Sequence, residues 1–262
     1  GTGLISTAIV EWLVAKGHTP ILFNRGLSPK RFDYDLETIF GNRADFAGFA
    51  SGMKKINVDA VIDMIAFDAK TAAHNVRVFR DRVRHFVFCS TVCVYGGPLT
   101  NIPANESEPH RPVSEYGRNK SKAEAIYAKA FREIGFPVTV MRPSHCYGPG
   151  QPLLDIWGYN PSLVTRIRKG KPIIVPGDGQ GLWQPGYIGD MAKGFVGALG
   201  RMGTRLRDLL PEQGGLVLGA ALEDAANPRI GERLPQDVTL GTDVKHALSS
   251  CDVAIDFSVP NA

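Results

Sequence analysis

The chain has 262 residues, of which 44% are hydrophobic and 21% charged, and its formal net charge is +4. This composition is typical of a soluble globular protein with one large α/β domain or two small ones. Basic residues form no block or stripe, which argues against a nucleic-acid partner. No apolar run of about 18 residues predicts a membrane span. No basic stretch followed by an apolar one predicts a secretory signal, so we expect a cytoplasmic protein.

The four cysteines are Cys89, Cys93, Cys146 and Cys251, and no CxxC pair occurs. Three of them lie in apolar segments, which favours reduced thiols over a disulfide framework. Cys89 and Cys93 are four residues apart, but no histidine is near enough in the sequence to complete a metal site. We therefore expect no metal.

Helical and strand patterns alternate through the first two-thirds of the chain. Apolar residues at helical spacing predict a helix over 5–16, ended by Gly17. The expected elements that follow are strands at 19–24 and 58–66, a helix at 69–80, a strand at 85–91, a helix at 114–134 ended by Gly135, and a strand at 136–143. This alternation indicates βαβ units, and hence an α/β fold with a doubly wound parallel sheet and helices on both faces.

The pattern loosens between 144 and 190, where turn-rich segments are suited to substrate contacts. Near residue 200 it restarts with an apolar run, a glycine turn and a helix in "FVGALGRMGTRLRDLL". Further strands are expected at 216–223 and 251–258. The sequence therefore predicts a second, partial nucleotide-binding unit after residue 199.

The most specific chemical signal is the spacing of Tyr116 and Lys120 in "YGRNK". Four residues are about one helical turn, so both side chains share a face of the helix. An ammonium there favours the phenolate and lowers the pKa of the tyrosine. Tyr116 is thus a candidate general acid/base; the alternative is a solvated helix face.

Three further segments accompany this pair: "GTGLIS" at the start, "FCSTVCVYG" at the end of a strand, and "RPSHCYGPG" after the next strand. Together they resemble the extended short-chain dehydrogenase/reductase family, the NAD(P)-dependent sugar epimerases and dehydratases, over about residues 1–199. The resemblance implies a Rossmann-type fold and hydride transfer coupled to a tyrosine acid/base. It also implies a small-molecule substrate such as a nucleotide sugar. Pairing into a homodimer through helices that include 114–134 would be in keeping with the family.

The resemblance assigns roles to individual residues. Thr91 matches the residue that hydrogen-bonds the substrate oxygen, and Tyr116 matches the acid/base. Lys120 matches the lysine that lowers the tyrosine pKa and binds the nicotinamide ribose. The implied cofactor contacts are Gly1, Gly3 and Ser6 at the pyrophosphate turn, with Ser6 in place of a third glycine, and Pro143, which begins the segment beside the nicotinamide.

Cofactor choice depends on the dipeptide Asn24-Arg25 in "ILFNRG". A carboxylate at this place binds the ribose 2′-hydroxyl, whereas an arginine accommodates a 2′-phosphate. We therefore favour NADP over NAD, the alternative being that Arg25 is a solvated turn residue. Asp63 either lines the cofactor groove or is a plain strand-end carboxylate. His145 is expected to be structural, the alternative being a contact with substrate. Asp190 matches the aspartate of the family's "VDD" segment and is expected to be structural rather than catalytic.

Residues 200–262 resemble the N-terminal half of dihydrodipicolinate reductase. Gly200 and Gly203 match its glycine turn, and Glu223 lies 20 residues after Gly203, where an acidic residue binds the adenosine ribose. This implies NADH, or both cofactors. The segment includes neither the histidines nor the catalytic lysine of that family, so we do not expect it to catalyse the reductase reaction.

Both resemblances are truncated. The first lacks its opening strand and its C-terminal substrate lobe; the second lacks its catalytic domain and, unless 193–199 supplies one, its opening strand. A chimera joined at "FVGALGRMG" accounts for this most simply. An exposed sheet edge in the first unit could then be covered by strands of the second. Three hypotheses follow: an epimerase/dehydratase-like enzyme, a dihydrodipicolinate reductase-like protein, and an inactive fold that at most binds a nucleotide.

Overall fold

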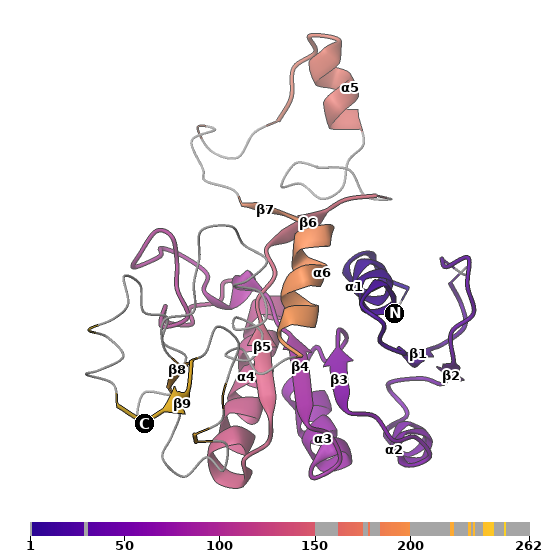
Figure 1. The fold of residues 1–262 in the computed structure, drawn as a ribbon. Helices are drawn as coiled ribbons and strands as arrows, with labels where there is room; N and C mark the ends of the chain where they lie inside the picture. Colours follow the sequence, from indigo (N-terminus) through magenta and orange to yellow (C-terminus); the bar gives the residue numbers. More distant parts are fainter. Residues whose placement is uncertain are drawn as a thin grey trace. The chain divides into compact units, whose positions relative to one another are not determined.

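The structure is a computed structural model that describes residues 2–28, 31–149, 162–174, 178 and 184–199. Beyond residue 200 it describes 221–222, 230–231, 233, 238–243 and 249. The chain divides into two compact units, Gly1–Leu199 and Gly200–Ala262, and each is considered by itself. Figure 1 shows the elements of both.

The elements of the first unit follow one another as helices and strands in alternation. In chain order they are α1 (Leu4–Ala15), β1 (Leu22–Asn24), β2 (Thr38–Phe40), α2 (Phe46–Lys54), β3 (Ala60–Asp63), α3 (Ala69–Phe79), β4 (His85–Cys89), the 3-10 turn η1 (Val92–Val94), α4 (Glu115–Ile134), β5 (Val138–Met141), β6 (His145–Tyr147), α5 (Ser162–Arg168), β7 (Pro185–Tyr187) and α6 (Ile188–Gly197).

The central sheet has the order β3-β4-β5, and both of its strand pairs are parallel. Its middle strand, β4, is buried from Phe86 to Cys89. Successive side chains of a strand point to opposite faces. Phe86 and Phe88 therefore enter one hydrophobic cluster, whereas Val87 and Cys89 enter the other.

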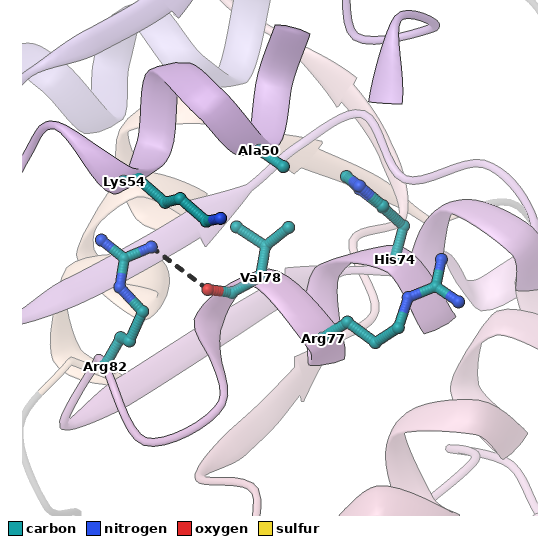
Figure 2. Close-up of a pocket in the computed structure, with 6 residues that line it drawn as sticks. All are labelled: Ala50, Lys54, His74, Arg77, Val78 and Arg82. Carbon is teal, nitrogen blue, oxygen red and sulfur yellow. Dashed lines mark hydrogen bonds between the residues drawn. The ribbon is translucent and has the colours of Figure 1, made fainter. Parts of the chain in front are cut away.

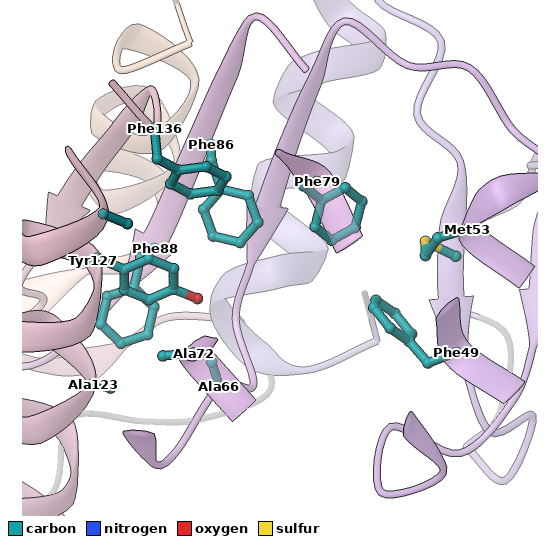
Figure 3. Close-up of a cluster of buried hydrophobic side chains, with 11 residues drawn as sticks. Phe49, Met53, Ala66, Ala72, Phe79, Phe86, Phe88, Ala123, Tyr127 and Phe136 are labelled. Carbon is teal, nitrogen blue, oxygen red and sulfur yellow. The ribbon is translucent and has the colours of Figure 1, made fainter. Parts of the chain in front are cut away.

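On the first face, α2, α3 and α4 cover the sheet. Phe86 and Phe88 lie against Tyr127 of α4, with ring centroids 5.5 Å and 4.8 Å from it. Phe79 of α3 and Phe49 of α2 extend the same cluster (Figure 3). These large aromatic side chains bury apolar area between the sheet and the helices, and so hold α2, α3 and α4 against one face of the sheet.

On the opposite face, α1 packs against α6 and both cover the sheet. Ile9 and Leu13 of α1 meet Phe195 and Val196 of α6 above Val87. Residues 9 and 13, like 192 and 196, are one helical turn apart, which places them on one face of each helix. Helices thus lie on both faces of a parallel sheet, which confirms the expected Rossmann-type α/β fold.

Two further parallel pairs flank this sheet: β1 with β2, and β6 with β7. In the described residues β1 pairs only with β2, and β3 pairs only with β4. The helix ends follow the sequence signals. Gly17 and Gly135 have φ angles of +79° and +65°, which a residue without Cβ adopts without strain.

The structure differs from expectation in several places. Helix α2 and strand β2 lie in a stretch for which no element was expected, and β6, α5 and β7 lie in the segment expected to be turn-rich. Residues 193–197 belong to helix α6, so the suggestion that 193–199 supplies an opening strand is wrong. Ile188, Ala192, Phe195 and Val196 of this helix are buried, and apolar residues at that spacing form a helical stripe.

In the second unit, β8 (Ala221–Leu222) pairs in parallel with β9 (Leu240–Gly241). The strand expected at 251–258 lies outside the described residues, as does most of that expected at 216–223. The covering of the first unit's sheet edge by the second unit stays a prediction. None of the helices that the structure describes is long and apolar enough to span a membrane.

Candidate active site

The residues expected to carry chemistry converge at the carboxyl ends of three neighbouring strands. Asp63 ends β3, Thr91 follows β4 by two residues, and Pro143 follows β5 by two residues. Parallel strands present their carboxyl ends at the same edge of the sheet, where open α/β folds bind ligands. Helix α4 brings Tyr116 and Lys120 to this edge.

Thr91 is held at the start of η1. Its side-chain oxygen accepts a hydrogen bond of 3.2 Å from the backbone N–H of Cys93, which caps the turn. The N–H of Val92 donates to the carbonyl of Pro143 at 3.1 Å, so the loops after β4 and β5 are joined beside the threonine. The structure thus places Pro143 directly beside the turn that Thr91 begins.

Tyr116 lies in the first turn of α4, which approaches the backbone of η1 closely at the next residue, Gly117. Its phenol therefore lies near the hydroxyl of Thr91, which opposes part of the rise in its pKa. The tyrosine is 44% exposed and so is open to a ligand. Its pKa is raised above the ordinary value of 10.0, chiefly by burial, with the neighbouring thiol of Cys89 adding to the shift. In the protein without ligands, desolvation of the phenol thus outweighs the influences that lower its pKa. That Lys120 lowers this pKa stays a prediction.

Lys120 is only 1% exposed, and its Nζ lies behind the tyrosine, 5.8 Å from the ring centroid. Nζ donates to the carbonyls of Cys89 at 2.6 Å and Ala66 at 3.0 Å. Burial lowers its pKa, and the charges of Cys89, Asp63 and Glu124 oppose that shift. An ammonium has three donors, so these two bonds leave one N–H without a carbonyl acceptor.

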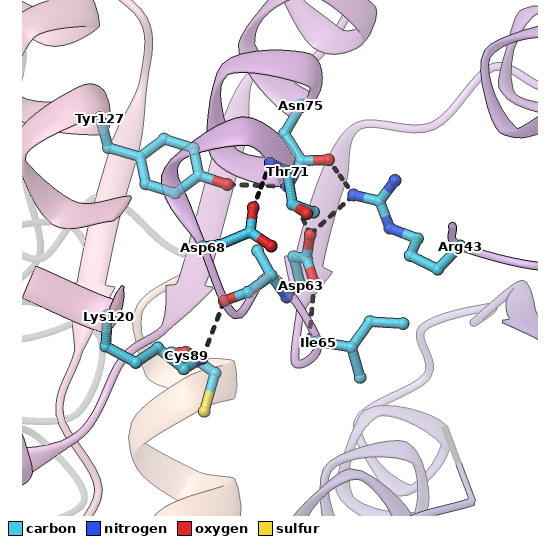
Figure 4. Close-up of polar contacts among 10 residues, drawn as sticks. Arg43, Asp63, Ile65, Asp68, Thr71, Asn75, Cys89, Lys120 and Tyr127 are labelled. Atoms are coloured by element: carbon cyan, nitrogen blue, oxygen red, sulfur yellow. Dashed lines mark hydrogen bonds and ion pairs between the residues drawn. The ribbon is translucent and has the colours of Figure 1, made fainter. Parts of the chain in front are cut away.

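Asp63 is saturated with donors from the protein itself (Figure 4). Oδ1 accepts from the backbone N–H groups of Ile65 and Ala66, at 2.8 Å and 3.0 Å. Oδ2 accepts from Arg43 at 3.1 Å and from Asn75 at 2.5 Å. Of the two expected roles, these contacts favour a strand-end carboxylate that fixes the turn after β3.

The glycine turn is described from residue 2 onward, so Gly1 lies outside the described residues. Gly3 caps the N-terminus of α1 and exchanges two hydrogen bonds with Ser6: its N–H donates to Ser6 Oγ at 2.9 Å, and the hydroxyl donates back to its carbonyl at 3.2 Å. A Cβ on Gly3 would lie 3.3 Å from that oxygen. Ser6 therefore replaces a glycine by closing the turn with its own side chain.

Asn24 is the last residue of β1, and its side-chain oxygen accepts from the N–H of Gly26 at 2.8 Å. This bond closes a tight turn in which Gly26 has a φ angle of +70°. Arg25, at the middle of the turn, is exposed. Within the described residues, the side chain of Arg25 forms no hydrogen bond or ion pair. The turn alone sets its direction.

A buried network beside the site was not expected from the sequence. Glu124, one turn after Lys120 on α4, is 5% exposed and accepts from the hydroxyl of Ser90. Arg142 donates to Glu124 at 2.5 Å and 3.0 Å, and to the hydroxyl of Tyr95 at 2.8 Å. Two features of the sequence could have indicated this network. Glu124 stands at i+4 from Lys120, and Arg142 directly precedes Pro143.

The remaining candidates lie on other elements or outside the described residues. His145 begins β6, and Asp190 is an exposed residue of α6 whose carboxylate lies 3.2 Å from Lys193. Gly200, Gly203 and Glu223 lie outside the described residues. In the part of the chain that is described, no group of three or more His, Cys, Asp or Glu side chains is arranged to hold a metal ion.

Two family models match the chain. The model of the NAD dependent epimerase/dehydratase family matches residues 1–206, and that of the dihydrodipicolinate reductase N-terminus matches residues 192–262. The two matches overlap from 192 to 206, within and just after α6. Both resemblances inferred from sequence motifs are thereby confirmed.

Curated proteins are similar to part of the chain. A chloroplast stem-loop binding protein of Arabidopsis thaliana is 27% identical over 76% of this chain and 53% of its own length. An uncharacterized UDP-glucose epimerase of Bacillus subtilis is 28% identical over 67% of this chain and 57% of its own length. The chain thus spans about half the length of the curated relatives it matches.

Solved structures agree on the fold. The UDP-glucose 4-epimerase of Thermus thermophilus, in complex with NAD, superposes with a TM-score of 0.63 at 23% identity, covering 75% of this chain and 71% of the other. The dTDP-glucose 4,6-dehydratase of Bacillus anthracis, also with NAD, gives a TM-score of 0.62 at 19% identity, covering 76% and 69%. At these identities the likeness establishes the Rossmann-type fold.

Proposed function

Because the chain belongs to the NAD dependent epimerase/dehydratase family, we propose that its first unit catalyses hydride transfer at a hydroxyl- or carbonyl-bearing carbon of a nucleotide sugar. The observation that carries the proposal is the placement of Tyr116 near Thr91 at the carboxyl edge of the sheet, with the buried ammonium of Lys120 5.8 Å from the centroid of the tyrosine ring. Curated relatives named as a UDP-glucose epimerase and a dTDP-D-glucose 4,6-dehydratase support the substrate class.

The residues present are suited to a nicotinamide dinucleotide. The first-turn amides of α1 have no intrahelical acceptors, and Gly3 leaves the approach to them free of a side chain. Exposed Arg25 is suited to a 2′-phosphate, and Lys120 keeps one N–H for a ribose hydroxyl. When bound, the dinucleotide would supply the acceptor and donor of the hydride.

The protein's own residues would handle the proton. With its pKa raised, the Tyr116 phenol is protonated at neutral pH, so it starts as a proton donor to a carbonyl oxygen. Thr91 would orient that oxygen, since its hydroxyl lies near the phenol. Once the proton has left, the ammonium of Lys120 would stabilise the phenolate by its charge.

The test of this function is turnover of UDP-glucose and dTDP-glucose by wild type and Tyr116→Phe. We expect Tyr116→Phe to lower kcat by roughly a hundredfold or more, the size of a general acid–base contribution. Dinucleotide binding, followed by NADPH fluorescence, should be retained. A Tyr116→Phe variant as active as wild type would contradict the proposal.

For the cofactor, we propose a preference for NADP over NAD. Arg25→Glu places a carboxylate where a 2′-phosphate is expected, and like charges repel. NADPH affinity should fall at least tenfold, while NADH affinity stays within about threefold. Arg31→Glu, beyond the turn, serves as the matched charge reversal. Equal losses for both cofactors would instead assign Arg25 to the shared part of the dinucleotide.

A second candidate function belongs to residues 200–262. Their match to the dihydrodipicolinate reductase N-terminus supports a dinucleotide site of their own, with Gly200, Gly203 and Glu223 as its expected contacts. We therefore propose that this segment binds NADH.

A further inference from the structure

A pocket of about 300 Å³ lies between α2 and α3, lined by residues that play no part in the proposed reaction (Figure 2). Ala50 and Lys54 line it from α2, His74, Arg77 and Val78 from α3, and Arg82 from the turn that follows α3. The volume is at the lower end of the range for small-molecule sites, roughly 300–1,000 Å³. The lining includes no acidic residue.

The charge of the pocket is positive. Within the part of the chain that the structure describes, the side chains of Lys54 and Arg77 have no ion-pair partner. Arg82 is fixed by hydrogen bonds to the carbonyls of Met53 at 2.7 Å and Ile56 at 3.1 Å, and to that of Val78 at 3.2 Å. These bonds use three of its five N–H groups.

Helix dipoles reduce this charge without cancelling it. Lys54 and Arg77 occupy the last turns of α2 and α3, and each helix C-terminus carries about half a negative charge. Three cations against two such termini leave about two positive charges. A phosphate group carries roughly −1.5 to −2 at neutral pH, so it would balance the pocket.

The side chain of His74 is a second indication, independent of the charge, that the pocket binds a ligand. It is 6% exposed, and its Nδ1 has no hydrogen-bond partner. The ring stacks on Phe46 at 4.4 Å between centroids, which fixes its orientation. A buried ring nitrogen without a partner is destabilising unless a ligand supplies one.

We propose that this pocket binds the phosphate group of a small phosphomonoester or of inorganic phosphate. Lys54, Arg77 and the free N–H groups of Arg82 would hold the oxygens, and Nδ1 of His74 would share a proton with one of them. Ala50 and Val78 offer an apolar wall to the organic part of an ester. The proposal is independent of the dinucleotide site and of the reaction at Tyr116.

The experiment follows the ring nitrogen signals of His74 by NMR in the full chain as inorganic phosphate is added. His74→Gln assigns the signal. We expect Nδ1 to shift on binding, and Lys54→Gln with Arg77→Gln to weaken affinity by at least about tenfold, as for loss of a charge-assisted hydrogen bond. The matched control, Lys55→Gln with Arg80→Gln, removes two neighbouring charges that do not line the pocket and should change affinity less than about twofold.

Other anions distinguish the sources of phosphate. Phenyl phosphate binding more tightly than inorganic phosphate would identify an ester as the ligand, and equal affinities would identify the free ion. Sulfate has the same shape but carries no proton at neutral pH, so it should bind more weakly. An unshifted Nδ1, equal binding of sulfate, or equal losses in the pocket and control variants would overturn the proposal.

Discussion

Among single residues, Cys89 and Cys146 have the clearest pKa shifts. Burial raises the pKa of Cys89 to about 12, although the charge of Lys120 opposes the shift, and burial raises that of Cys146 to about 11. Both thiols therefore stay protonated in the folded protein at a pH where they ionise in the unfolded chain. Folded protein then binds more protons than unfolded, so stability falls as pH rises above the unfolded value of 9.0.

We predict that Cys89→Ala makes this decline in stability with pH shallower. One such thiol loses about 2 kcal/mol of unfolding free energy between about pH 9 and about pH 10.5. Urea unfolding of wild type and Cys89→Ala at both pH values measures the difference. Exposed Cys93 provides the control, because Cys93→Ala should leave the slope unchanged. Parallel slopes for wild type and Cys89→Ala would contradict the buried, protonated thiol.

Asp63 gives a second prediction at the residue scale. Its ion pair with Arg43 is largely buried, so Asp63→Ala leaves a guanidinium without its partner. We expect the unfolding free energy to drop by about 3 kcal/mol. Asp59→Ala breaks the exposed pair with Arg84 and should lower it by less than about 0.5 kcal/mol. If Asp63→Ala instead weakened dinucleotide binding with unchanged stability, Asp63 would be a cofactor contact.

At the scale of elements, the approach of α4 to η1 decides whether Tyr116 reaches Thr91. Gly117 follows the tyrosine, and a Cβ on it would lie 2.4 Å from the carbonyl oxygen of Cys93. That oxygen belongs to the backbone of η1, so it cannot yield without moving the turn. Glycine is required here by a close contact between two elements rather than by its own dihedral angles.

Gly117→Ala is therefore predicted to push α4 away from η1. Activity should fall by at least tenfold, because a displacement of about 1 Å at a catalytic site lowers rates strongly. The melting temperature should fall as well. Gly52→Ala, inside α2, meets only an ordinary contact of 3.7 Å with Ile39 and should stabilise the protein by about 0.5–1 kcal/mol. An active, stable Gly117→Ala protein would show that η1 and α4 move independently.

Half of the elements of the first unit were predictable because apolar periodicity is a local signal; they are α1, β1, β3, α3, β4, α4 and β5. The patterns at 5–16, 69–80, 85–91 and 114–134 each match a helix or strand to within two residues. Helix α6 was not predicted because its stripe lies in a segment whose glycines suggest a turn. Gly189, Gly194 and Gly197 are accommodated there since packing against α1 outweighs their low helix propensity.

At the scale of the whole molecule, two family matches meet within one chain, and each implies a dinucleotide site. We predict that the sites respond to separate substitutions. Gly3→Asp, which puts a carboxylate at the N-terminus of α1, should abolish binding by the first unit. Glu223→Ala should weaken NADH binding by the second.

Fluorescence titration of the full chain with NADH and NADPH distinguishes the two binding sites. If both units bind a dinucleotide, each single variant should retain one binding event, and only the double variant should lose both. Glu223→Gln, which keeps the size of the side chain without its charge, tests whether the ribose contact is ionic. If Gly3→Asp alone removed all binding, the segment after residue 199 would have no site of its own.

The sequence by itself determined the family, the βαβ order and the residues Thr91, Tyr116 and Lys120 as candidates, because motifs and periodicity are local properties of the chain. Only the tertiary structure decided how those side chains are solvated and partnered. Burial raises the pKa of Tyr116, and Asp63 is enclosed by Arg43 and Asn75. Desolvation and long-range hydrogen bonds depend on segments distant in sequence meeting in space, and no local pattern encodes that meeting.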